Sequence, residues 1–234
     1  MGRFFWSKLQ YFMDNNIKDS YCAILEKISK TKSNFNKKSY KVNFIAVSKS
    51  QPVSKIDQVL DLGHRSFGEN RVQEAALKWI NLKKKYSNIE LHLIGSLQSN
   101  KVKEALQIFD VIQTLDREKL ARRILDLSLD LELTPRLFIQ VNTGDEQQKG
   151  GIKLSESSEF IRYCQEDLNL KIIGLMCIPP INENSENHFK ILSKLRSDHK
   201  LKFLSMGMSD DYMQAIENGA THIRIGRNLF GDRL

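Results

Sequence analysis

The sequence has few cysteines and no histidines paired at the spacing of a metal site. Cys22, Cys164 and Cys177 are an odd number at wide spacing, so we expect neither a disulfide framework nor a zinc site. We interpret these cysteines as buried thiols. The five histidines form no ligand-like pair either, and we therefore predict that the protein binds no metal.

Long apolar runs are also absent. No segment approaches the length that a bilayer-spanning helix requires. The apolar opening, residues 1–6, is followed from Lys8 onward by polar residues, which interrupt it before it could form the core of a secretory signal. We therefore expect no membrane association and a cytoplasmic location.

Positive charge is in excess. The 36 Lys and Arg residues outnumber the 28 Asp and Glu residues and give a net charge of +8, which suits attraction to phosphate on a small molecule or on nucleic acid. Many lysines, as in residues 30–41, lie beside Asn and Ser rather than among aromatic residues. This pattern favours a solvated surface over an RNA-binding face.

The sequence is organised around residues 44–49, an apolar run that ends at Lys49. Its length is typical of a strand buried on both faces. An amine at the end of such a strand sits on rigid backbone and is partly desolvated, which lowers the pKa of a lysine and makes it a nucleophile toward aldehydes. From this segment alone, a surface lysine at a strand end remains the alternative.

The rest of the sequence alternates between apolar runs and helical patterns. A helix over about residues 12–30 and a polar, basic loop over residues 31–39 precede the first strand. Further strands are expected around residues 66–67, 91–95, 109–114, 136–141, 172–176, 202–206 and 221–226. Eight strands separated by helices favour a closed (β/α)8 barrel of the TIM type, with an open doubly wound sheet as the alternative.

We predict a single domain over residues 1–234. Its first part, residues 1–41, is the N-terminal helix with the basic loop, and residues 42–231 form the barrel. A chain of this length can bury a sizeable core in one domain.

In a barrel of this kind the site lies at the carboxyl ends of the strands. Lys49 provides an amine there, and the Gly- and Ser-containing loops after the seventh and eighth strands commonly hold phosphate. Ser209–Asp211 is also explained as a helix cap. Arg224 lies inside an apolar strand, where a buried cation needs either a carboxylate or a ligand's heteroaromatic nitrogen as its partner. Pyridoxal 5'-phosphate (PLP) carries the aldehyde, the phosphate and the ring nitrogen that would satisfy these groups together.

Six groups of segments carry a resemblance to a known family. They are AVSK at 46–49, FGENRVQE at 67–74, HLIG with LQSNK within 92–101, GLM at 174–176, LSMGMSDD at 204–211, and RIG with FG within 224–231. Together they are similar to the signature set of the pyridoxal phosphate homeostasis proteins, and they occur in order over residues 42–231. The resemblance implies a single barrel of the kind found in the N-terminal domain of alanine racemase, without known catalytic turnover.

The resemblance also implies roles for individual residues. Lys49 would form an imine with PLP, Asn70 would lie near the cofactor ring, and Arg224 would face the pyridine nitrogen. The residues implied to serve the phosphate are Ser205, Ser209 and Gly226.

Arg227 departs from the family pattern, in which Ser or Thr usually follows the glycine equivalent to Gly226. A guanidinium either holds the phosphate by charge or points away from it, and we include Arg227 among the predicted cofactor-binding residues. Ser96 stands where relatives often have His or Pro, and we draw nothing from this difference.

The sequence favours a carrier over an enzyme. Racemases with this barrel use a second acid or base from an added β domain after the barrel, and only residues 227–234 follow Gly226. Without a placed base, proton abstraction is inefficient. We therefore predict that the protein has no catalytic residues and that it buffers PLP or delivers it to PLP-dependent apoenzymes. We also expect a monomer that does not bind nucleic acid.

Three alternatives remain open at this point. The first is a PLP-dependent amino-acid racemase with residual activity, and the second is a Schiff-base aldolase that uses Lys49 on a sugar phosphate. The third is a basic RNA-binding module, whose affinity for oligonucleotides would depend steeply on salt.

Overall fold

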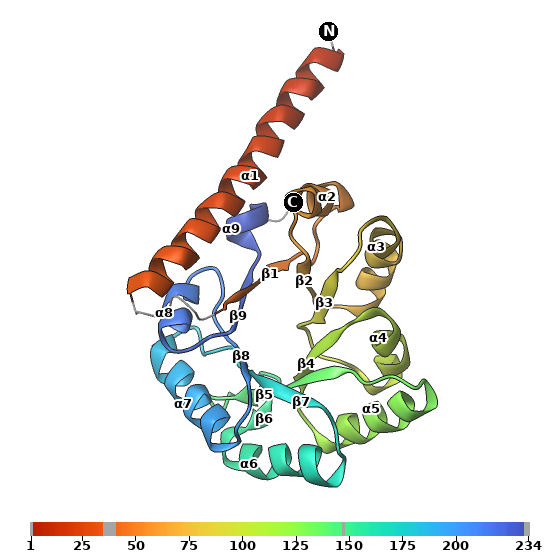
Figure 1. The fold of residues 1–234 in the computed structure, drawn as a ribbon, viewed down its shortest axis with the longest axis vertical. Coiled ribbons are helices and arrows are strands. Elements are labelled where there is room, and N and C mark those ends of the chain that lie inside the picture. Colours follow the sequence, from red (N-terminus) through yellow and green to blue (C-terminus); the bar gives the residue numbers. More distant parts are fainter. Residues whose placement is uncertain (1, 35–40, 147, 232–234) are drawn as a thin grey trace.

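The computed structural model describes residues 2–34, 41–146 and 148–231, and Figure 1 shows the elements arranged as a barrel. Its helices are α1 Gly2–Asn34, α2 Val53–Asp61, α3 Val72–Lys85, α4 Val102–Ile108, α5 Glu118–Asp130, α6 Leu154–Arg162, α7 Ser185–Asp198, α8 Tyr212–Glu217 and α9 Arg227–Phe230. Its strands are β1 Asn43–Val47, β2 Ser66–Glu69, β3 Glu90–Leu93, β4 Val111–Leu115, β5 Arg136–Asn142, β6 Ile152–Lys153, β7 Ile172–Met176, β8 Phe203–Ser205 and β9 His222–Ile225.

The strands form a closed parallel barrel. Along its circumference the order is β1, β2, β3, β4, β5, β7, β8 and β9, and β9 pairs with β1 to complete the ring. Helices lie on the outside of the ring in Figure 1. The predicted (β/α)8 barrel is therefore confirmed, and the open doubly wound sheet is wrong. The two-residue strand β6, which pairs only with β5, was not predicted because so short a segment leaves no periodic pattern.

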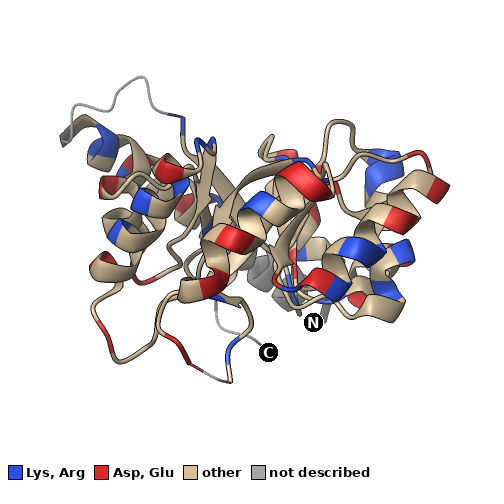
Figure 2. Cartoon of the chain, turned by 90° about the horizontal axis from the view of Figure 1, so that it is seen from below, with Lys and Arg blue, Asp and Glu red and all other residues tan. Residues whose placement is uncertain are grey.

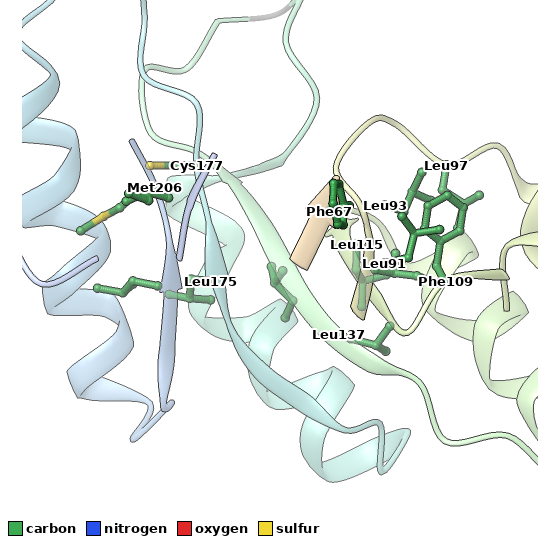
Figure 3. Packing of buried hydrophobic residues seen from close by; sticks show 14 of the residues in the cluster. Phe67, Leu91, Leu93, Leu97, Phe109, Leu115, Leu137, Leu175, Cys177 and Met206 are labelled. Carbon is green, nitrogen blue, oxygen red and sulfur yellow. The ribbon is translucent and has the colours of Figure 1, made fainter. Parts of the chain in front are cut away.

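The apolar core lies mainly between the strands and the surrounding helices. In β9, Ile223 and Ile225 belong to this layer, whereas the alternate residues His222 and Arg224 point into the barrel. Figure 3 shows part of the layer, including the labelled side chains of Phe67, Leu91 and Leu115. The strands thus present apolar residues to the helices and leave polar groups inside the barrel.

A second, smaller apolar cluster comes from the strands alone. Val111, Phe138 and Met176 form it, and Phe203 packs against it. Because no helix contributes to this cluster, it lies within the barrel and fills part of the interior below the carboxyl ends of the strands.

Helix α1 packs along the outside of the barrel. It contacts α2, α8 and α9, and Ile17, Ile24 and Ile28 are buried at helical spacing. The helix is longer than the predicted 12–30, because it begins at Gly2 and continues to Asn34. The predicted basic loop is therefore helical in its first part, and residues 35–40 lie outside the described residues.

Charge is distributed over the helices rather than collected on one of them. Figure 2 shows Lys and Arg interspersed with Asp and Glu in the view from below. Several surface lysines are held in ion pairs, such as Lys83 with Asp110 at 2.8 Å and Lys190 with Glu186 at 2.7 Å. Within the described ranges, the helices all fall short of the combined length and apolarity that a membrane crossing would need.

Candidate functional site

A cavity of about 600 Å³ lies at the carboxyl ends of β1, β2, β8 and β9. Six of the seven predicted site residues line it: Lys49, Asn70, Ser209, Arg224, Gly226 and Arg227. They come from four separate parts of the chain, and the parallel barrel brings them together because it places every strand's carboxyl end at the same mouth.

Lys49 lies in a tight turn directly after β1. The strand ends at Val47, two residues earlier than predicted, and the Gln51 N–H donates to the Ser48 carbonyl at 3.1 Å to close the turn. Ser50 has a φ of 59°, in the left-handed region that residues other than glycine seldom adopt. Lys49 is half-buried and lines the cavity, so a constrained backbone holds this residue there.

Arg224 is a buried cation that no carboxylate in the described part of the chain neutralises. Its Nη1 donates to Ser205 Oγ and its Nη2 donates to the Cys177 carbonyl, both at 2.8 Å. Burial lowers the pKa of Arg224, against the opposing influence of Cys177 and Asp211. The sequence left two partners open for this arginine, a core carboxylate and a ligand's heteroaromatic nitrogen. Among the described residues, the fold does not provide the carboxylate.

Ser205 is the predicted site residue that does not line the cavity. It is fully buried in β8, where its hydroxyl accepts the bond from Arg224 and donates to Gln113 Oε1 at 2.6 Å. Gln113 Nε2 lies 3.0 Å from His92 Nδ1. Ser205 thus belongs to a buried polar chain that holds the guanidinium from below, and its direct contacts are with Arg224 and Gln113.

The loops after β8 and β9 lie side by side at the cavity. Asn228 Nδ2 donates to the Ser209 carbonyl at 2.9 Å and so joins them. Arg227 is exposed, with Nη2 4.0 Å from Asp210 Oδ2. These loops bring Ser209, Gly226 and Arg227 to the wall of the cavity.

The prediction that Ser209 caps the following helix is wrong. Helix α8 begins at Tyr212, and Asp211 occupies the cap position without a side-chain bond to the helix. Asp211 Oδ1 instead accepts from the Met208 N–H at 2.6 Å. The loop curls back on itself before the helix starts, and Ser209 therefore stays in the part of the loop that lines the cavity.

The backbone of Asn70 packs closely on Gly95. A Cβ atom at position 95 would lie 2.3 Å from the Asn70 carbonyl oxygen, a distance that backbone atoms cannot tolerate. The glycine that ends the predicted HLIG segment therefore allows Asn70 to reach the cavity.

Sequence reasoning missed several residues of the cavity wall. They are Val47, Gln51, Ile94, Ile178, Met208, Asp210 and Gly231. Ile94 and Ile178 each follow the end of a strand closely, which is the signal that could have identified them. Gln51 is buried although it is polar, and only the turn at Lys49 explains why its side chain lies at the cavity.

A larger depression, of about 790 Å³, lies at the opposite mouth of the barrel. Its lysines, Lys41 and Lys202, are exposed, and Arg136 donates to Glu90 Oε1 at 2.6 Å. The half-buried amine and the buried guanidinium without a carboxylate partner are found together at the carboxyl mouth. Within residues 2–34, 41–146 and 148–231, no group of His, Cys, Asp and Glu is arranged to hold a metal ion.

Comparison with known proteins identifies similar chains. Residues 22–234 match the model of the family described as alanine racemase, N-terminal domain. The pyridoxal phosphate homeostasis protein of Aquifex aeolicus is 37% identical over 90% of this chain and 95% of its own length. That of Escherichia coli K12 is 36% identical, covering 94% of this chain and 97% of its own length. The structure of PipY from Synechococcus elongatus with PLP bound has a TM-score of 0.74 and 32% identity, covering 87% of this chain and 100% of PipY.

Proposed function

Because the chain belongs to the family of pyridoxal phosphate homeostasis proteins, we propose that it binds PLP in the cavity at the carboxyl ends of its strands. One observation carries the proposal. Arg224, buried and without a carboxylate partner among the described residues, lines the same cavity as the half-buried amine of Lys49. A ligand with an aldehyde and a hydrogen-bond acceptor could react with Lys49 and accept a bond from Arg224.

The residues present fit this cofactor. When bound, PLP supplies an aldehyde for covalent capture and a ring that acts as an electron sink. The Lys49 nitrogen would attack the aldehyde carbon, and the carbonyl oxygen would leave as water, so that an imine bond remains. A guanidinium has five N–H donors and no acceptor, and Arg224 uses two of them on Ser205 and Cys177. It can therefore donate to an unprotonated ring nitrogen.

The remaining predicted residues divide into two groups. Ser209, Gly226 and Arg227 are proposed to hold the phosphate, and Asn70 to lie beside the ring, since all four line the cavity. For Ser205 we propose an indirect role, because its hydroxyl contacts the Arg224 guanidinium and is fully buried. We propose further that residues 42–231 form the cofactor-binding unit and that residues 1–41 extend it.

We propose that the role is to hold and release PLP rather than to transform a substrate. The described residues that line the cavity include no tyrosine, histidine or cysteine to act as a second acid or base beside Lys49. Asp210 is there, but its side chain is 83% exposed, and a solvated carboxylate is a poor base for a carbon acid. PLP-dependent apoenzymes as recipients, a monomeric state and a cytoplasmic location stay predictions.

Titration of the purified apoprotein with PLP tests the proposal. We expect the visible absorption band of a protonated imine to grow to one equivalent, because Lys49 is the one lysine among the described residues that line the cavity. Reduction with borohydride followed by peptide mass spectrometry should place a pyridoxyl group on Lys49. Absence of both the band and the adduct at saturating PLP would refute the proposal.

The racemase alternative has its own measurement. The PLP-loaded protein is incubated with L-alanine in deuterated water, and exchange at the α-carbon is followed by NMR. We expect no exchange above that of free PLP, because Asp210, the one carboxylate among the described residues of the cavity wall, is solvated. Exchange that turns over many times per protein molecule and is lost in Lys49→Ala would support the racemase hypothesis instead.

Arg224→Gln should weaken PLP binding by about 10- to 100-fold, since hydrogen bonds to a charged group are worth about 1.5–3 kcal/mol. The adduct on Lys49 should still form at high PLP, because the amine is unchanged. Equilibrium titration of the absorption band measures the effect. Arg136→Gln, at the opposite mouth, is the matched control and should bind PLP like the wild type. Equal affinities for Arg224→Gln and the control would show that the buried guanidinium does not contact the cofactor.

A further inference from the structure

Helix α3 carries a buried lysine next to the turn that contains Lys49. Lys78 Nζ lies 2.8 Å from Glu69 Oε1 and 2.7 Å from Glu74 Oε1. The side chain of Lys78 is 9% exposed and that of Glu69 is 0% exposed. We refer to these three residues, Lys78, Glu69 and Glu74, as the Lys78 cluster. Of the three, none lines the cavity of about 600 Å³.

The Lys78 cluster binds the backbone on both sides of Lys49. On the preceding side, Lys78 Nζ donates to the Ser48 carbonyl at 2.9 Å, and Ser48 Oγ donates to Glu69 Oε1 at 2.7 Å. On the following side, the Ser50 N–H donates to Glu74 Oε1 at 2.5 Å. Lys49 is therefore the central residue of a backbone segment that is attached at both ends to one set of charges.

The attachment matters because the turn is strained. Ser50 holds a φ of 59°, and a non-glycine residue in this region is stable only where its surroundings hold it there. The bond from the Ser50 N–H to Glu74 supplies part of that hold. Burial raises the pKa of Glu74, but the bonds from Lys78 and from the Ser50 N–H outweigh it and lower the pKa overall. The carboxylate is thus charged at neutral pH and bonds Ser50 as an ion.

We propose that Lys78 is a positioning residue for Lys49: with Glu69 and Glu74 it holds the Ser48–Gln51 turn so that the Lys49 amine faces the cavity before an aldehyde arrives. This inference rests on the proposed function, since it concerns capture of PLP by Lys49. Preorganised groups avoid the loss of conformational entropy on binding. The two carboxylates also engage the amine of Lys78, so that capture occurs at Lys49.

A pair of lysine variants on α3 tests the role of Lys78. Lys78→Met removes the ammonium group and keeps the chain length, and Lys83→Met is the matched control, because Lys83 lies on the same helix and pairs with Asp110 at 2.8 Å. The readouts are the rate of formation of the imine band, the affinity for PLP and the site of the reduced adduct. We expect Lys78→Met to slow capture by at least tenfold and Lys83→Met to behave like the wild type.

Two Glu74 variants keep the inference testable if Lys78→Met does not fold. Removing Lys78 leaves Glu69 as a buried charge without its partner, which is strongly destabilising, whereas the side chain of Glu74 is 28% exposed. Glu74→Gln retains an acceptor for the Ser50 N–H but loses the charge, and Glu74→Ala loses both. We expect capture to be slowest in Glu74→Ala, less slow in Glu74→Gln, and as fast as in the wild type in the Lys83→Met control.

The outcomes separate the inference from the function on which it rests. If the wild type forms the adduct on Lys49 and both Glu74 variants capture PLP at the wild-type rate, the positioning role is wrong and the function stands. An adduct on Lys78 in the wild type also overturns the positioning role. If the wild type forms no adduct at all, the proposed function fails and the inference fails with it.

Discussion

Lys49→Ala is expected to abolish covalent capture of PLP. The variant should show no imine band and no pyridoxyl group in peptides from the turn at residues 48–51 after borohydride reduction. Alanine has no amine, and the structure brings no other lysine to the wall of the cavity within the described part of the chain. This is the largest effect expected from any single substitution on the binding chemistry.

Non-covalent binding should survive in part. Arg224, Ser209 and Arg227 remain in place at the cavity, and a phosphate group can still be held by charge and hydrogen bonds. We expect the affinity for PLP to fall by at least about 100-fold, equivalent to about 3 kcal/mol. Competition between PLP and inorganic phosphate, followed by calorimetry, measures this residual site.

Two further variants make the experiment decisive. Lys49→Arg keeps a positive charge but cannot form the imine, so it separates electrostatic attraction from covalent capture. Lys171→Ala removes an exposed lysine just before β7 and should capture PLP like the wild type. A borohydride adduct that persists in Lys49→Ala at the wild-type yield would mean that another amine is the tether.

Acid is expected to destabilise the fold strongly between pH 7 and pH 4.5. Burial lowers the pKa of His64 to about 4 and the pKa of His222 to about 3. The folded pKa of each histidine lies below its unfolded value of about 6.5. The unfolded state therefore binds more protons as the pH falls, and the stabilisation that is complete above pH 6.5 is lost progressively toward pH 3–4.

The surroundings of both histidines explain why they resist protonation. The His64 ring lies among Tyr21, Phe44 and Phe67, and its Nε2 is 2.7 Å from the Ser66 carbonyl. The His222 ring lies between the rings of Phe138 and Phe203, with centroids at 5.3 and 5.2 Å. An imidazolium in either place would lose its hydration without gaining a carboxylate at hydrogen-bond distance.

Between pH 7 and pH 4.5, each histidine is expected to lower the free energy of unfolding by about 2.5 kcal/mol, and the two together by about 5 kcal/mol. This is a large share of the roughly 5–15 kcal/mol by which a typical domain is stable. Glu90, whose pKa is lowered to about 2 mainly by its bond with His92, loses its contribution only below about pH 4.5. Urea unfolding at the two pH values, followed by fluorescence of the buried Trp79, measures the difference.

Substitutions assign the pH effect to the two residues. His64→Gln and His222→Asn keep a nitrogen donor but cannot be protonated, and each should reduce the difference between the two pH values by about half. The control is His199→Gln, because the His199 ring contacts Ser158 at the surface. This variant should leave the difference in stability between the two pH values unchanged. A wild-type unfolding free energy that changes by less than about 1 kcal/mol between pH 7 and pH 4.5 would contradict the prediction.

The barrel was predictable because its signal is local and repeated. In the sequence, each buried strand is a short apolar run and each helix is a periodic apolar stripe. Few folds are compatible with eight such alternations. Part of the cavity wall was predictable for the same reason, since Asn70 and Gly226 directly follow strands and Lys49 lies in the turn after one. Ser209 was identified, but its assignment as a helix cap was wrong, because hydroxyl and carboxylate residues have similar turn preferences and only the folded loop distinguishes them.

The sequence by itself determined that the strands would form a parallel barrel with an amine and a glycine- and serine-containing wall at one mouth, since strand order and chain direction place those residues there. Only the tertiary structure decided which groups form hydrogen bonds and ion pairs with the residues around the cavity. Nothing local shows that Ser205 in β8 would bond Arg224 in the neighbouring strand β9, that Arg224 would lack a carboxylate among the described residues, or that Lys78 would bind the backbone beside Lys49. These contacts join residues 19 to 30 positions apart, and their geometry exists only once helix and strand have packed.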